Sequence, residues 1–138
     1  MTKKKPSYYF KYDACIRITG CGDLYSEITR KTGLSPSHAH LKGDLRDPKS
    51  KKRYEQDIWI LESPLKKIAK LEKHIDWLWR EVSPHKSYFK KLISKSPYSD
   101  LCISCRSDCS WPLLGINKES LTILHRLPLS VSFNFTLF

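Results

Sequence analysis

The chain has 138 residues and a formal net charge of +11, and hydrophobic residues make up 40% of it. These values suit one globular domain and exclude a disordered segment. No apolar run approaches the roughly 20 residues of a membrane-spanning helix, and the N-terminus lacks the apolar middle region of a signal peptide. We expect a cytoplasmic protein without a membrane partner, with a basic tail over residues 1–7 and a single α+β domain over residues 8–138.

The positive charge is unevenly distributed along the chain. Residues 1–62 carry 13 basic and 8 acidic side chains, residues 63–98 carry 9 and 3, and residues 99–138 carry 3 and 3. The last segment is therefore neutral. A basic surface favours acidic partners, protein or nucleic acid, mainly by raising the rate of encounter.

The first half of the chain predicts short elements separated by turn residues. Alternating apolar side chains predict a half-buried strand at the start. Gly33 is placed to end the first helix in a left-handed conformation. The expected elements are a strand over 8–19, a helix over 25–32, a short strand over 38–42, an exposed loop over 44–57 and a central strand over 57–62 with both faces covered.

The second half predicts more helix. Apolar residues recur every three or four positions from Leu65 to Val82, through Ile68 and Ile75, and Ser63 and Pro64 are typical of a helix start. Ser83-Pro84 interrupts the pattern. The expected elements are a helix from 63 to this break, a helix over 85–94, a strand over 98–105, a helix over 117–126 capped by Asn117, and a strand over 129–137.

This order predicts an α+β fold, with an open, mostly antiparallel sheet of four or five strands and helices packed on one face. In the last strand, Phe133 and its apolar neighbours at every second position are expected in the core. Phe133→Ala should therefore be strongly destabilising, and Ser132→Ala nearly silent. The polar residues of that strand are expected to face solvent or a partner.

Several short motifs, in this order, resemble one bacterial family. They are Ile16 to Gly20, Glu27-Ile28-Thr29, Thr32 to Pro36, Lys42-Gly43-Asp44, Trp59 with Leu61-Glu62-Ser63, and the Leu71 to Leu78 helix before Ser83-Pro84. Together they resemble the domain of unknown function 4279 family over roughly residues 8–138. The resemblance implies a likeness to small proteins that are encoded near polymorphic toxins. Some of these small proteins are proposed to be immunity proteins. It supplies no catalytic residues.

Cysteine and histidine pairs suggest a metal site only weakly. Cys102, Cys105 and Cys109 have partial zinc spacing, but alternation in a strand sends Cys102 and Cys105 to opposite faces. His38 and His40 should share a strand face, and we interpret them as polar surface residues. We therefore expect no metal and no cofactor, and without any catalytic motif we expect that the chain is not an enzyme.

Basic side chains on the predicted helices are the candidate partner-binding residues, together with one tryptophan. Trp77 is either an interface anchor among lysines or packed beneath the following helix. The candidate residues are Lys66, Lys70, Lys73, Trp77 and Lys90.

Two functions remain open. The first hypothesis is a non-catalytic binding protein, an immunity protein that binds and neutralises a cognate bacterial toxin protein. The alternative is a basic accessory protein that binds nucleic acid, although no known nucleic-acid-binding motif accompanies the lysines.

Overall fold

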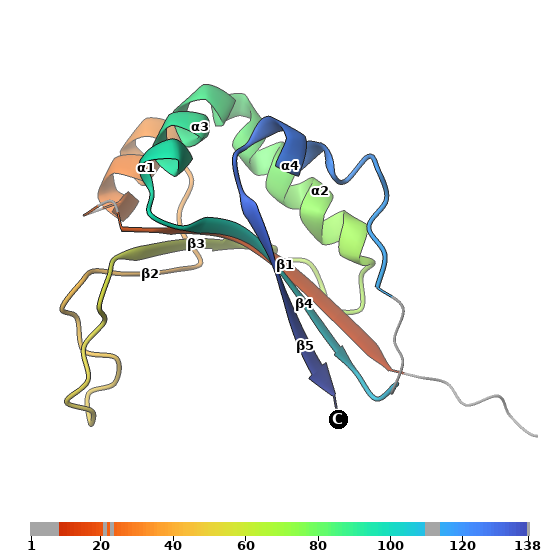
Figure 1. Cartoon of the computed structure of the whole chain (residues 1–138), viewed down its shortest axis with the longest axis horizontal. Helices are drawn as coiled ribbons and strands as arrows, with labels where there is room; N and C mark the ends of the chain where they lie inside the picture. Colours follow the sequence, from red (N-terminus) through yellow and green to blue (C-terminus); the bar gives the residue numbers. More distant parts are fainter. Residues whose placement is uncertain (1–8, 21, 23, 110–113, 138) are drawn as a thin grey trace, which may run out of the picture.

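A computed structural model describes residues 9–20, 22, 24–109 and 114–137 (Figure 1). The expected tail over residues 1–7 lies outside the described residues. The elements in chain order are β1 (Phe10–Thr19), α1 (Leu24–Thr32), β2 (His38–His40), β3 (Ile58–Glu62), α2 (Leu71–Val82), the 3-10 turn η1 (Ser83–His85), α3 (Lys86–Lys95), β4 (Ser99–Ser107), α4 (Thr122–Arg126) and β5 (Ser130–Leu137).

The strands form one open, mixed sheet in the order β2-β3-β1-β4-β5. The β1–β3, β1–β4 and β2–β3 pairs are antiparallel, and β4 and β5 are parallel. The parallel pair requires a crossover, which contains α4. The predicted α+β class and the mostly antiparallel, open sheet are confirmed.

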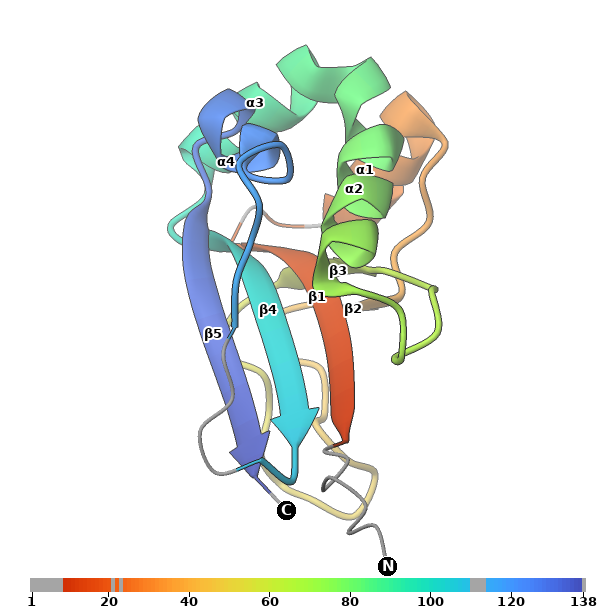
Figure 2. The ribbon, with the colours of Figure 1, turned by 90° about the vertical axis from the view of Figure 1, so that its right-hand side faces the viewer.

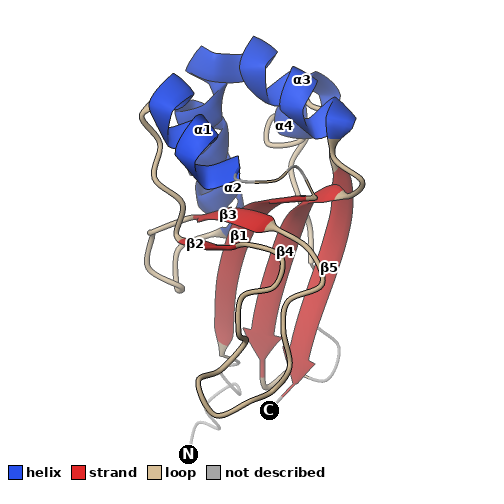
Figure 3. Ribbon diagram, turned by 90° about the vertical axis from the view of Figure 1, so that its left-hand side faces the viewer, coloured by secondary structure: helices blue, strands red, loops and turns tan. Residues whose placement is uncertain are grey.

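The described helices cover one face of the sheet (Figures 1 and 3). Even-numbered residues of β1, such as Ile16 and Ile18, point to this face and meet Ile75 and Leu78 of α2 in one buried cluster. The alternation seen in the sequence therefore marks the helix side, and the odd-numbered side chains of β1 lie on the other face. None of the described helices is long and apolar enough to cross a membrane.

Two glycines at element ends require their conformational freedom. Gly33 has a φ of +75° and ends α1 as predicted, with its amide donating to the Thr29 carbonyl at 2.8 Å. Gly20 has a φ of +71° at the end of β1, and a Cβ there would lie 2.7 Å from the ring of Pro97. The β1–α1 turn and the α3–β4 turn therefore approach each other because residue 20 has no side chain.

The predicted helix start at Ser63 is wrong, because α2 begins only at Leu71. Residues 63–70 instead run beside β1, where the Ser63 amide donates to the Ala14 carbonyl and the Tyr12 amide donates to the Lys67 carbonyl. These bonds to β1 replace the helical ones. Ile68, expected on the buried stripe, is 74% exposed.

The last helix is also shorter than predicted. The Asn117 side chain accepts a hydrogen bond from the Ser120 amide at 2.8 Å, so it caps a turn, and α4 begins at Thr122. Ile123 and Leu127 are buried, whereas Leu121, just before the start of α4, is exposed.

Two strands are less covered than predicted. In β3, Trp59 and Leu61 are buried but Ile58 and Ile60 are partly exposed, because none of the described helices covers their face. In β5, Phe133 pairs beside Ile103 and so lies on the helix side, yet it is 60% exposed. Figure 2 shows that β5 extends beyond the helices. The expectation that Phe133 lies in the core is therefore wrong.

Candidate functional site

The face of the sheet opposite the helices, called the open face below, is not covered by any of the described helices. Pairing in register places on it the odd-numbered residues of β1, the even-numbered residues of β3, β4 and β5, and both histidines of β2. Its exposed and partly exposed members include Lys11, Asp13, Arg17, Ile60, Ser104, Arg106, Asn134 and Thr136. The open face thus combines charged, polar and apolar side chains on a rigid support.

An ion pair stands at the centre of the open face. Asp100, whose side chain is fully buried, accepts two hydrogen bonds from the Arg17 guanidinium, at 2.8 Å from Nε and 2.5 Å from Nη2. The Tyr98 hydroxyl and the Ser132 hydroxyl also donate to this carboxylate, at 2.8 and 2.6 Å. The network joins β1, β4 and β5 through their side chains.

Charge and hydrogen bonding decide the protonation of this pair. Burial acts to raise the pKa of Asp100, but the hydrogen bonds from Arg17, Ser132 and Tyr98 outweigh it and hold the pKa below its usual value. The bonds to Asp100 raise the pKa of Arg17. Both groups therefore stay charged at neutral pH, and the Arg17–Asp100 pair offers no proton to a reaction.

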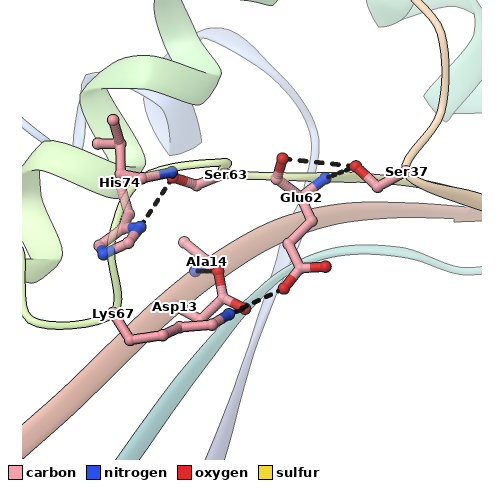
Figure 4. Close-up of polar contacts among 8 residues, drawn as sticks. Asp13, Ala14, Ser37, Glu62, Ser63, Lys67 and His74 are labelled. Carbon is pink, nitrogen blue, oxygen red and sulfur yellow. Dashed lines mark hydrogen bonds and ion pairs between the residues drawn. The ribbon is translucent and has the colours of Figure 1, made fainter.

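A second polar cluster lies where residues 63–70 meet the strands (Figure 4). The Lys67 ammonium contacts Asp13 of β1 and, at 3.0 Å, Glu62 of β3. Nearby, the Ser63 hydroxyl lies 2.7 Å from Nδ1 of the buried His74. The His74 imidazole is buried where residues 63–70 meet α2. Burial and then the charge of Lys67 lower the pKa of His74, so it is neutral.

The Lys67 cluster borders a cleft of about 430 Å³ at one end of the open face, lined also by Ser104, Arg106 and Thr136. Burial, then a hydrogen bond to Glu62, raise the pKa of Asp13 to about 6 against the opposing effect of Lys67. The hydrogen bond with Asp13 is the main cause that lowers the pKa of Glu62. The two carboxylates therefore share a proton in mildly acidic solution.

Asp13→Asn should change the pH dependence of stability. The folded protein holds the proton of Asp13 up to about pH 6, whereas the unfolded chain releases it near its ordinary pKa of 3.8. The stabilisation by this proton is full at low pH and lost as the pH rises through 6. From about pH 4.5 to about pH 7.5, wild type should lose on the order of 1 kcal/mol relative to Asp13→Asn.

Urea unfolding at both pH values measures this difference. Glu55→Gln, an equally charge-neutralising change in the exposed loop between β2 and β3, is the matched control and should leave the pH dependence as in wild type. An Asp13→Asn curve parallel to that of wild type across this range would contradict the raised pKa.

The segment between β2 and β3 lies on the side away from the helices (Figures 1 and 3). Tyr54 stacks on His40, with ring centroids 3.3 Å apart, and the Arg46 guanidinium lies over the Tyr54 ring, 5.5 Å from its centroid. His38 and His40 share a face as predicted, with ring nitrogens 3.5 Å apart. The contacts tie the segment to β2 and leave a run of exposed lysines beside the open face, namely Lys49, Lys51 and Lys52.

The cysteines do not form a metal site in the described residues. Cys102 pairs with Cys15 on the open face and Cys105 pairs with Tyr12 on the other face, as strand alternation predicted. No group of three or more candidate ligands occurs in the part of the chain that the structure describes. Burial, followed by the proximity of Cys102, raises the pKa of Cys15 to about 12, so this thiol is not a nucleophile at neutral pH.

The five candidate partner-binding residues do not lie together in one site. Lys66, Lys70 and Lys73 are exposed at and before the start of α2, and Lys70 lines a hollow of about 470 Å³ with Tyr12. Lys90 lies on α3 beside Lys91 and Lys95. Trp77 is partly buried against the core, which favours the packing interpretation. Sequence reasoning missed the open face, because only strand register brings its residues together.

In the described residues, the open face holds the charged Arg17–Asp100 pair, and the Cys15 thiol on the same face stays protonated at neutral pH. The structure is an α+β domain in which the described helices cover one face of a five-stranded sheet and leave the other face free of any described helix. The family model described as "Domain of unknown function (DUF4279)" matches residues 10–137, and the chain belongs to this family. No curated protein and no solved structure matches the chain.

Proposed function

We propose that the chain is a non-catalytic cytoplasmic protein that binds a cognate bacterial toxin and neutralises it, as an immunity protein does. The observation that carries the proposal is the open face, which five strands hold rigid and no described helix covers. A rigid surface of mixed polarity binds a protein without a large ordering penalty. Membership of the family supports the toxin as the partner.

Charge limits the kind of surface that this partner presents. The exposed lysines beside the open face, Lys49, Lys51 and Lys52, would attract an acidic patch and accelerate association. A nuclease toxin has a basic active site for its nucleic acid, so a basic immunity protein would dock on an acidic surface next to that site. Neutralisation would then follow from blocking access of the substrate.

The alternative, binding of nucleic acid, has less support. Sheet surfaces that bind single-stranded nucleic acid stack bases on exposed aromatic rings. Within the described strands, Phe10, Tyr12, Trp59, Phe133 and Phe135 all belong to the helix side. Two tyrosines outside the strands adjoin the open face, but both rings have partners there, since the Tyr98 hydroxyl bonds Asp100 and Tyr54 stacks on His40. Positive charge alone supports only weak, non-specific binding of about 10⁻⁴–10⁻⁶ M near physiological salt.

Removing the loop lysines should slow association with the toxin. The variant Lys49→Ser/Lys51→Ser/Lys52→Ser is expected to reduce the association rate constant about tenfold at low salt, with a smaller effect at high salt, because steering charges are screened. Surface plasmon resonance with a purified candidate toxin, sought among the products of neighbouring genes, measures both rates.

The matched control is Lys90→Ser/Lys91→Ser/Lys95→Ser, which removes the same charge from α3 on the opposite side of the sheet. This α3 variant should lower the association rate constant by less than about threefold, compared with about tenfold for the loop variant. If the α3 variant were slowed more than the loop variant, docking would occur on the helix side. Nanomolar affinity of wild type for nucleic acid, without affinity for the toxin, would support the alternative function.

A further inference from the structure

Strand β5 is an edge of the sheet that lacks the usual protection against pairing. It pairs with β4 on one side, and no described strand pairs with its other side. Its sequence, from Ser130 to Leu137, contains no charged residue and no proline. Edge strands normally carry lysine, proline or a bulge, because an unprotected edge pairs with another strand. An eight-residue edge strand without these features is therefore expected to pair with another strand.

Large apolar side chains are exposed along the same strand. Phe135 is 44% and Leu137 58% exposed, in addition to Phe133. By contrast, Val131, near α4, is partly buried against the core. Figure 2 shows α4 above the first residues of β5 and no helix over the remainder. One half of β5 is therefore covered and the other half is not.

The pattern of β5 is symmetric about Asn134. Residues at equal distances on either side are alike in character, and they are the pairs Phe133 and Phe135, Ser132 and Thr136, and Val131 and Leu137. An antiparallel copy of the strand, centred on Asn134, would place each phenylalanine opposite a phenylalanine on one face and each hydroxyl opposite a hydroxyl on the other. Such self-complementarity is what a two-fold interface requires, and aromatic cross-strand pairs stabilise it.

The two-fold arrangement also accounts for the uneven exposure of β5. It would bring the covered half of one copy, with Val131 and α4, beside the exposed half of the other, with Phe135 and Leu137. The apolar side chains of each copy would thus gain the cover that its own helices do not provide. Full burial of phenylalanine removes on the order of 150–250 Å² from water per side chain.

Charge distribution favours a second copy as the occupant. Two chains of net charge +11 repel each other over most of their surfaces. Residues 99–138, which include β4, α4 and β5, carry equal numbers of basic and acidic side chains. Copies that meet along β5 therefore approach through the neutral part of the molecule, where repulsion is weakest.

We propose that the protein is a symmetric dimer in which two β5 strands pair antiparallel about Asn134, joining the two sheets into one. The helices of both copies then lie on one side of the joined sheet, and the two open faces form one continuous surface on the other. The dimer does not depend on the proposed function, because it uses the edge of the sheet and not its open face.

Light scattering after size exclusion, with the full chain at about 50 μM, tests the proposal. Wild type should have twice the chain mass of 16.2 kDa. Phe133→Lys should have the mass of a single chain, because a lysine at the centre of an edge prevents pairing. Ile68→Lys, which adds the same charge at an exposed apolar residue outside β5, should remain a dimer.

The far-ultraviolet circular dichroism spectrum shows whether each variant is folded. If Phe133→Lys were unfolded, Leu137→Lys, at the end of the strand, should replace it and give the single mass. Wild type at the mass of one chain would overturn the proposal, and so would folded lysine variants of β5 that remain dimers.

Discussion

Asp100→Ala is expected to lower the free energy of unfolding by about 3–5 kcal/mol, which is the usual effect of removing one partner from a buried ion pair. Asp100 is fully buried and accepts from Arg17, Tyr98 and Ser132. Without the carboxylate, the partly buried guanidinium of Arg17 keeps its charge but has no counter-ion. The two hydroxyls lose an acceptor as well.

Urea unfolding measures the loss, with Asp47→Ala as the control. Asp47 is exposed, and its side chain accepts only from the amide of Lys49 in the same loop, so this change should cost less than about 1 kcal/mol. The double variant Arg17→Met/Asp100→Leu should recover part of the stability, because apolar residues can replace a buried ion pair. A loss below 1 kcal/mol for Asp100→Ala would show that the network is not structural.

Ile75→Ala should destabilise the fold by about 2–5 kcal/mol, as other truncations of buried aliphatic side chains do. Ile75 on α2 is 1% exposed and lies in the core cluster with Ile16 and Leu78. Truncation leaves a cavity between α2 and the sheet that the rigid strands cannot close.

Ile68→Ala is the matched control, since it removes the same atoms from a residue that the sequence pattern placed on the same stripe. Because Ile68 is exposed in the structure, its truncation should change the unfolding free energy by at most about 0.5 kcal/mol. Equal losses for the two variants, measured by urea unfolding, would contradict the start of α2 at Leu71.

These two isoleucines show where sequence reasoning succeeds and where it fails. Spacing of three and four residues identified α2, but the same spacing continues by chance into residues 63–70. There, Lys67 meets Asp13, which lies 54 positions away in the sequence. Partners at that separation become neighbours only through strand register, and no local pattern reveals them.

Strand β5 shows a different limit. Alternation assigned Phe133 to the correct side of the sheet, beside Ile103, but alternation does not tell which parts of that side a helix covers. Conversely, Ser132 was expected to be silent, and its hydroxyl donates to Asp100, which lies 32 positions earlier. We now expect Ser132→Ala to cost about 1 kcal/mol by loss of this bond.

The open face was missed for the same reason. Two of its charged residues, Arg17 and Asp100, lie 83 positions apart in the chain. The sequence showed only that β5 has polar side chains opposite its apolar ones. That signal indicated a solvent-facing side for β5 alone. Only the register of all five strands shows that their polar side chains lie on the same face of the sheet.

The most direct test of the proposed function is growth rescue by co-expression with a candidate toxin, sought among the products of neighbouring genes. The variant Ser104→Arg places a bulky charge on the open face, where Ser104 lines the cleft. The control Ser87→Arg makes the same change at an exposed site on α3. Thermal unfolding should show that both variants are folded.

Wild type and Ser87→Arg should restore growth, and Ser104→Arg should not, because the added side chain blocks close contact with the toxin. Failure of wild type to restore growth would contradict the immunity function. Rescue by Ser104→Arg as complete as that by wild type would contradict the open face as the binding surface.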